Sequence, residues 1–76
     1  MAKKTIYCVQ AFWKNDRKLA MGAMRQFKTE EAAREAGLSA SRRNVGVLVY
    51  SVEGCAELDD WGDPRVLARH GDVPRT

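Results

Sequence analysis

The sequence has few of the residues that catalytic sites most often use. Its 76 residues include one histidine, His70, and two cysteines, Cys8 and Cys55. A hydrolytic Cys-His pair would require His70, close to the C-terminal end, to meet one of these thiols, and no signature of such a site surrounds either of them. We therefore expect a protein that is not an enzyme and that uses no cofactor.

The acidic residues show no metal-binding pattern. Five of them lie between positions 53 and 63, namely Glu53, Glu57, Asp59, Asp60 and Asp63. They lack the alternating spacing, with glycine at the sixth position, that a calcium-binding loop requires. The glycines likewise form no phosphate-binding loop. We expect a solvated acidic loop over residues 53–64, no metal ion and no small-molecule ligand.

Long hydrophobic runs are also missing. No stretch approaches the roughly 18 consecutive apolar residues of a transmembrane helix. The N-terminus is charged, but Gln10 and Lys14 leave no apolar core of the length, about 7–15 residues, that a signal peptide needs. Two cysteines do not make a secreted disulfide framework. These observations predict a cytoplasmic location and no membrane partner.

The length of the chain predicts one small domain over residues 1–76, with flexible tails at about residues 1–4 and 72–76. Its composition, 45% apolar and 30% charged, is typical of a folded domain. A chain this short buries only about 60–65% of its unfolded surface. So small a core provides little stability. Because no metal or disulfide is indicated, self-association is the usual source of the additional stability that such a chain needs.

The stretch from Lys4 to Trp13 is the strand on which we expect the fold to be built. Seven of its last eight residues are apolar or aromatic, and only Gln10 interrupts them. Such a short run, rich in β-branched and aromatic residues, is typical of a strand that is covered on both faces. Residues 45–52 form a second strand of the same kind. We expect the first strand at the centre of a sheet.

A hairpin should follow the first strand. Residues 14–18 are all polar and suit a turn between two strands. The run from Leu19 to Phe27 alternates weakly and contains Gly22, which favours an edge strand with a bulge at the glycine.

A helix should begin after Thr29, which is a good N-cap, with Glu30 and Glu31 in its first turn. One side of this helix carries only small residues, namely Ala32, Ala33, Ala36, Gly37 and Ala40. Such a side lets a helix lie close to a sheet, which gives a reason for a glycine inside the helix. The residues 42–44, Arg-Arg-Asn, should end it.

These elements predict an α+β fold of topology ββαββ. A right-handed crossover through the helix brings the third strand beside the first, which gives an antiparallel four-stranded sheet of order 2-1-3-4 with the helix on one face. The last short strand is expected over Arg65–His70. The intervening acidic loop has room for one helical turn over residues 56–60.

One helix covers only one face of this sheet. We expect Tyr7, Val9, Ala11 and Trp13 of the first strand to face the helix. The opposite face then consists of Ile6, Cys8, Gln10 and Phe12, and either the loop around Trp61 or a second copy of the chain must cover it. This face is the candidate surface for self-association.

Positive charge is concentrated in the N-terminal part of the chain. Residues 1–44 contain ten Lys and Arg against four Asp and Glu, and residues 45–76 contain three Arg against six acids. The hairpin turn and the helix end could join in one basic patch, made of Lys14, Arg17, Lys18, Arg42 and Arg43. A patch of this kind would bind nucleic acid through phosphate contacts. A solvated face, or a contact with the acidic half of another copy, are the alternatives.

Four segments together resemble a family of short, uncharacterised bacterial proteins of similar length. They are VQAFW (9–13), RQFKTEEAAREAG (25–37), GVLVYSVEG (46–54) and DDWGDPRVLARHGDVP (59–74). The resemblance covers nearly the whole chain and includes the unusual DDWGDPR segment. It implies a small, independent cytoplasmic domain with no assigned activity.

Overall fold

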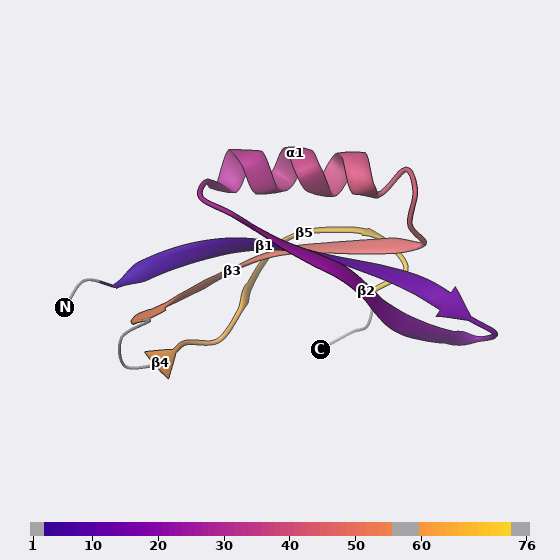
Figure 1. The fold of residues 1–76 in the computed structure, drawn as a ribbon, viewed down its shortest axis with the longest axis horizontal. Coiled ribbons are helices and arrows are strands. Elements are labelled where there is room, and N and C mark those ends of the chain that lie inside the picture. Colours follow the sequence, from indigo (N-terminus) through magenta and orange to yellow (C-terminus); the bar gives the residue numbers. More distant parts are fainter. Residues whose placement is uncertain (1–2, 56–59, 74–76) are drawn as a thin grey trace.

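The computed structural model describes residues 3–55 and 60–73. It shows one antiparallel sheet with a single helix on one of its faces (Figure 1). The elements are β1 (Lys4–Asn15), β2 (Lys18–Phe27), α1 (Glu30–Ala40), β3 (Gly46–Cys55), β4 (Asp60–Trp61) and β5 (Arg65–Gly71).

The sheet has the predicted order with one strand more than expected. Neighbouring strands follow β2-β1-β3, and β5 pairs with β3 as the predicted last strand should. The additional strand is β4, a two-residue segment that pairs with the end of β3 at Gly54 and Cys55. The acidic segment is therefore not all loop, and Asp60 is extended rather than helical. The rest of the suggested helical turn, residues 56–59, lies outside the described residues.

The two ends of the predicted domain are only partly described. Lys4 already belongs to β1, so this strand begins inside the expected N-terminal tail. At the other end, the backbone N–H of Asp72 donates to the carbonyl of Val45 at 3.0 Å. Residues 1–2 and 74–76 lie outside the described part of the chain.

The first strand occupies the centre of the sheet, as its composition predicts. It pairs with β2 from Tyr7 to Asn15 and with β3 from Lys4 to Phe12. The stretch from Tyr7 to Phe12, half of the strand, therefore has paired neighbours on both sides. Apolar side chains on both of its faces are buried as a result.

The hairpin between β1 and β2 is tighter than the expected five-residue loop. Only Asp16 and Arg17 lie between the two strands, and Asp16 takes a positive φ of 61°. Aspartate tolerates this left-handed conformation better than most residues. The register of β1 with β2 shifts between Gln10 and Phe12, which places the predicted bulge beside Gly22.

The helix begins as predicted and ends earlier. The Thr29 hydroxyl accepts a hydrogen bond from the Ala32 N–H at 3.1 Å, which satisfies one free donor of the first turn. The last helical residue is Ala40, and Ser41 is the C-cap. Arg42 and Arg43 therefore lie in the turn after the helix.

The core lies between the helix and the sheet. Ala33, Val47 and Val49 are fully buried there, and Val9 packs with them. Tyr7 also packs against this cluster, so the first strand presents the predicted face to the helix. Trp13, predicted on the same face, is half-exposed and does not belong to the cluster.

The helix lies close to the sheet at Gly37. A β-carbon at this position would overlap Cγ2 of Val49. Since Val49 is fully buried and cannot move into free space, only glycine fits at this contact. The small-residue side of α1 thus serves the close approach that its sequence predicts.

We predict that Gly37→Ala lowers the free energy of unfolding by about 1–3 kcal/mol, although alanine is the better helix former by about 1 kcal/mol. Urea denaturation followed by circular dichroism measures the change. Ser39→Ala, on the exposed side of the same helix, is the control and should stabilise slightly. A Gly37→Ala variant as stable as the Ser39→Ala variant would contradict the tight contact.

Candidate functional site

The face of the sheet opposite α1, which we call the open face, carries a group of exposed apolar side chains. Strand register places Met24 beside Gln10 and Met21 beside Phe12 on this face. Leu48 and Tyr50 of β3 lie on the other side of β1. Val66 of β5 is paired with Tyr50 and continues the surface. Met21, Met24 and Val66 are 73%, 48% and 39% exposed.

The residues of β1 itself form the floor of the open face rather than its surface. Cys8, Gln10 and Phe12 are only 2–6% exposed. They are covered because the side chains of β2 and β3 meet above them, where the Tyr50 hydroxyl donates a hydrogen bond to Sδ of Met24 at 3.4 Å. A partner on this face would therefore contact mainly β2, β3 and β5.

Gln10 is the one buried polar residue among those described, and it stabilises the bulge in β2. Its Nε2 donates to the carbonyl oxygens of Ala11 and Gly22, both at 2.9 Å, and to that of Ala23 at 3.4 Å. A bulge leaves backbone groups without partners in the ladder. The side chain of Gln10 satisfies such carbonyls from the neighbouring strand, which explains a polar residue inside an apolar strand.

Trp61 covers only one end of the open face. Its ring lies so close to Gly54 that a β-carbon there would overlap it. Alternate residues of a strand face the same side, so Gly54 shares the open face with Tyr50. The Trp61 ring therefore lies on the open face, at the end of the sheet. In the middle, Pro64 borders a small apolar hollow with Leu48 and Val66. The residues described between positions 60 and 64 thus leave most of the face uncovered.

The geometry does not bring a thiol and the histidine together. His70 is paired with Val47 and shares the helix side of the sheet, whereas Cys8 lies on the open face. Burial raises the pKa of the Cys8 thiol, and a hydrogen bond with Tyr50 lowers it by a smaller amount. The same burial raises the pKa of Tyr50. A thiol of raised pKa is a poor nucleophile at neutral pH.

The acidic segment forms no metal site within residues 3–55 and 60–73. No group of three or more His, Cys, Asp and Glu side chains there is arranged to hold a metal ion. Glu57 and Asp59 lie outside these ranges.

Two parts of the predicted basic patch have different neighbours. Lys14 and Arg17, at the hairpin, border a depression together with Arg69 of β5. Arg43 borders a different cavity, beside Arg25 of β2. Lys18 belongs to the hairpin and Arg42 to the turn after α1. An acid already neutralises part of the hairpin end, since Nζ of Lys14 lies 3.1 Å from Oδ2 of Asp72.

The acidic residues gather at the other end of the sheet. Glu53 is paired with Thr5, near the start of β1, and it borders a depression with Glu30 and Asp63. The hairpin turn lies about 30 Å away, because a strand advances about 3.3 Å per residue. Lys3 lies 4.0 Å from Glu53 and Arg65 borders the same depression, so part of this negative charge is offset. The molecule therefore has a basic end at the hairpin and a more acidic end, with cations of its own, at the start of β1.

Comparison of the chain with protein-family models, with curated protein sequences and with solved structures finds no match. No helix within the described residues is long and apolar enough to cross a membrane.

We predict that Gln10→Met, which keeps the size of the side chain, lowers the free energy of unfolding by about 1–3 kcal/mol, because the carbonyls at the bulge lose their donor. Gln26→Met, at an exposed position of β2, is the matched control and should change stability by less than about 0.5 kcal/mol. Equal stabilities of the two variants in urea denaturation would show that the Gln10 amide does not hold the bulge.

Proposed function

We propose that the protein is a non-enzymatic interaction module that forms a homodimer through its open face. The observation that supports this proposal is the exposure of Met21, Met24 and Val66 on one surface that the described part of the chain leaves largely uncovered. Contiguous exposed apolar surface on a small domain is typical of an interaction site.

The size of the face suits a dimer of moderate affinity. Four strands at about 4.8 Å spacing and about ten residues at about 3.3 Å make a face of about 630 Å² before side-chain relief is counted. A standard interface buries about 800 Å² on each partner. The open face therefore approaches the area of a specific contact, and we expect association at micromolar rather than nanomolar concentration.

The charges favour one orientation of the two copies. In a twofold dimer with antiparallel strands, the hairpin end of one copy, with Arg17 and Arg69, lies over the far end of the other. Glu53 and Asp63 lie at that end on the helix side of the sheet, so their attraction acts around the end of the sheet rather than across the interface. A parallel arrangement would place ends of like charge together. We propose the antiparallel dimer for this reason.

We predict that sedimentation at micromolar concentration reports about twice the 8.5 kDa mass of the chain. Met21→Glu should weaken the dimer about tenfold or more, because the carboxylate would be buried without a partner. Leu38→Glu, at an exposed apolar position on the helix, is the matched control and should leave the dimer intact. Circular dichroism checks that both variants fold.

A wild-type chain that sediments as a monomer would contradict the dimer, and dissociation by Leu38→Glu alone would move the interface to the helix. The salt dependence of the dimer tests the orientation of the two copies. Added salt should weaken an antiparallel dimer, since it screens opposite charges, and should strengthen a parallel one.

Nucleic-acid binding is a second candidate function, in which Lys14, Arg17, Lys18, Arg42 and Arg43 contact phosphates. The separation of charge favours it, because the described residues of the acidic segment lie at the far end of the sheet from the hairpin. A nucleic-acid backbone could therefore approach the basic end without passing over Glu53 or Asp63.

For five phosphate contacts we predict a slope of about −4.5 in the plot of log affinity against log salt for duplex DNA, and about −3.5 for single strands. Reversing the charges of Arg42 and Arg43 to Glu should weaken binding regardless of base sequence. Arg34→Glu is the control, because Arg34 is paired with Glu30 at 2.8 Å on the helix. Absence of a gel shift at about 50 mM salt and micromolar protein would exclude this function.

We further propose that the protein acts in the cytoplasm. Both of its cysteines are free, Cys8 in the sheet and Cys55 at the end of β3. Free thiols persist in reducing compartments.

A further inference from the structure

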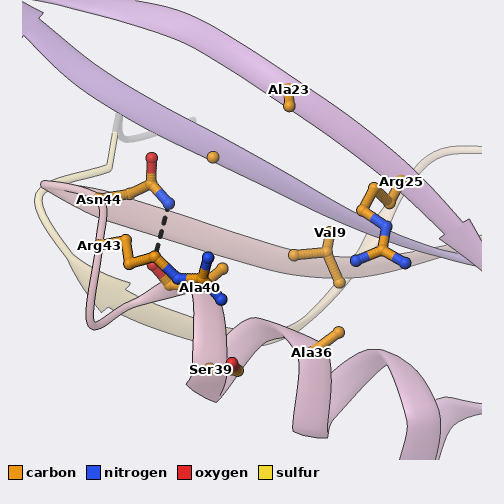
Figure 2. A pocket seen from close by; sticks show the side chains of 9 residues that line it. Val9, Ala23, Arg25, Ala36, Ser39, Ala40, Arg43 and Asn44 are labelled. Atoms are coloured by element: carbon orange, nitrogen blue, oxygen red, sulfur yellow. Dashed lines mark hydrogen bonds between the residues drawn. The ribbon is translucent and has the colours of Figure 1, made fainter.

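A cavity of about 270 Å³ lies on the helix side of the sheet, between the end of α1 and the two strands of the hairpin (Figure 2). Alanines from three elements line it, namely Ala11 of β1, Ala23 of β2, and Ala36 and Ala40 of α1. The space exists because these facing side chains are all methyl groups. Val9 completes the apolar lining.

Two arginines from different elements border this apolar space. Arg25 comes from β2 and Arg43 from the turn after α1, and Figure 2 shows them on opposite sides of Val9 and Ala36. The guanidinium of Arg25 lies 5.2 Å from the ring centroid of Phe27, which supports its position. No acidic residue lines the cavity, and neither arginine is in an ion pair with a residue of the described ranges.

The helix end beside the cavity does not present a free carbonyl there. The C-terminus of a helix carries partial negative charge, which would repel an anion. Here the carbonyl oxygen of Ala40 accepts three hydrogen bonds, from the backbone N–H groups of Arg43 and Asn44 and from Nδ2 of Asn44. This hydrogen bonding, shown in part in Figure 2, reduces the negative potential at the helix end where Arg43 borders the cavity.

We propose that this cavity binds a small organic carboxylate with an apolar body. The alanine and valine lining would receive the apolar body, and the guanidinium of Arg43 would bind the carboxylate through charge-assisted hydrogen bonds, while Arg25 on the other side of Val9 adds positive charge to the rim. The volume lies near the lower limit for ligand pockets, which restricts the body to a short aliphatic chain or a single ring.

Amide chemical shifts of the ¹⁵N-labelled protein test the proposal with three probes. Hexanoate combines the charge with an apolar chain, 1-hexanol has the chain without the charge, and inorganic phosphate has charge without a chain. Hexanoate at millimolar concentration should shift the amides of Ala36, Ala40, Arg43 and Asn44, and the other two probes should shift them at least about tenfold less at equal concentration.

Three variants separate the charge from the shape of the cavity. Arg43→Gln should weaken hexanoate binding about tenfold, because a charge-assisted hydrogen bond is lost. Arg42→Gln removes the same charge one residue earlier, outside the cavity lining, and should leave binding nearly unchanged. Ala23→Leu keeps both arginines and fills the space from the side of β2 that faces the helix, and it should abolish binding.

Several outcomes would overturn the proposal. An absence of shifts at Ala36, Ala40, Arg43 and Asn44 on addition of hexanoate would show that the cavity does not bind it. Phosphate that shifts these amides as strongly as hexanoate, or full binding by the Ala23→Leu variant, would show a surface attraction without a role for the cavity. Hexanoate shifts confined to Met24 and Tyr50 would assign binding to the open face.

Discussion

The hydrogen bonding of β1 on both of its edges is the constraint on which the rest of the structure depends. This strand pairs with β2 through the hairpin and with β3 across the helical connection. Its backbone is thus paired on both edges from Tyr7 to Phe12, and the side chains of this stretch must be covered on two faces. The described residues form one helix, so one face receives a compact core and the other mainly the side chains of the neighbouring strands.

The two faces meet this requirement by different means. On the helix side, Gly37 allows α1 to lie directly on Val49, and small residues replace large ones at the contact. On the open face, Tyr50 and Met24 reach toward each other above β1. These two side chains help to bury the residues of β1 beneath them, and the outer surface that they form is apolar. An interaction surface and a well-packed floor therefore arise from the same side chains.

Much of this fold could be predicted from local sequence features. The apolar runs in β1 and β3, the N-cap at Thr29 and the small-residue side of α1 are properties of consecutive residues, and the crossover rule gave the sheet order. Strand β4 was not predicted, because its two residues are extended only through their pairing with the end of β3. A contact between distant segments leaves no periodic pattern in so short a strand.

The candidate sites could be predicted only in part from local sequence features. The residues predicted for the open face, such as Cys8 and Phe12, have the correct orientation, but the exposed side chains belong to the neighbouring strands. The bulge at Gly22 decides which residues of β2 lie beside them, and its register cannot be counted from the sequence. The cavity between Arg25 and Arg43 likewise depends on where the helix ends, two residues before the predicted Arg42.

Bulges also interrupt the two long outer strands of the sheet, beside Gly22 in β2 and opposite Val49 and Tyr50 in β5. An outer strand with unpaired backbone groups is a template on which further chains can add, and this is the first step of fibril growth. A bulge bends the strand and disrupts the regular spacing that such growth requires. Gln10 holds one of these bends from inside the sheet. A residue of the central strand thereby holds the outer strand β2 in a bent form that suits strand addition poorly.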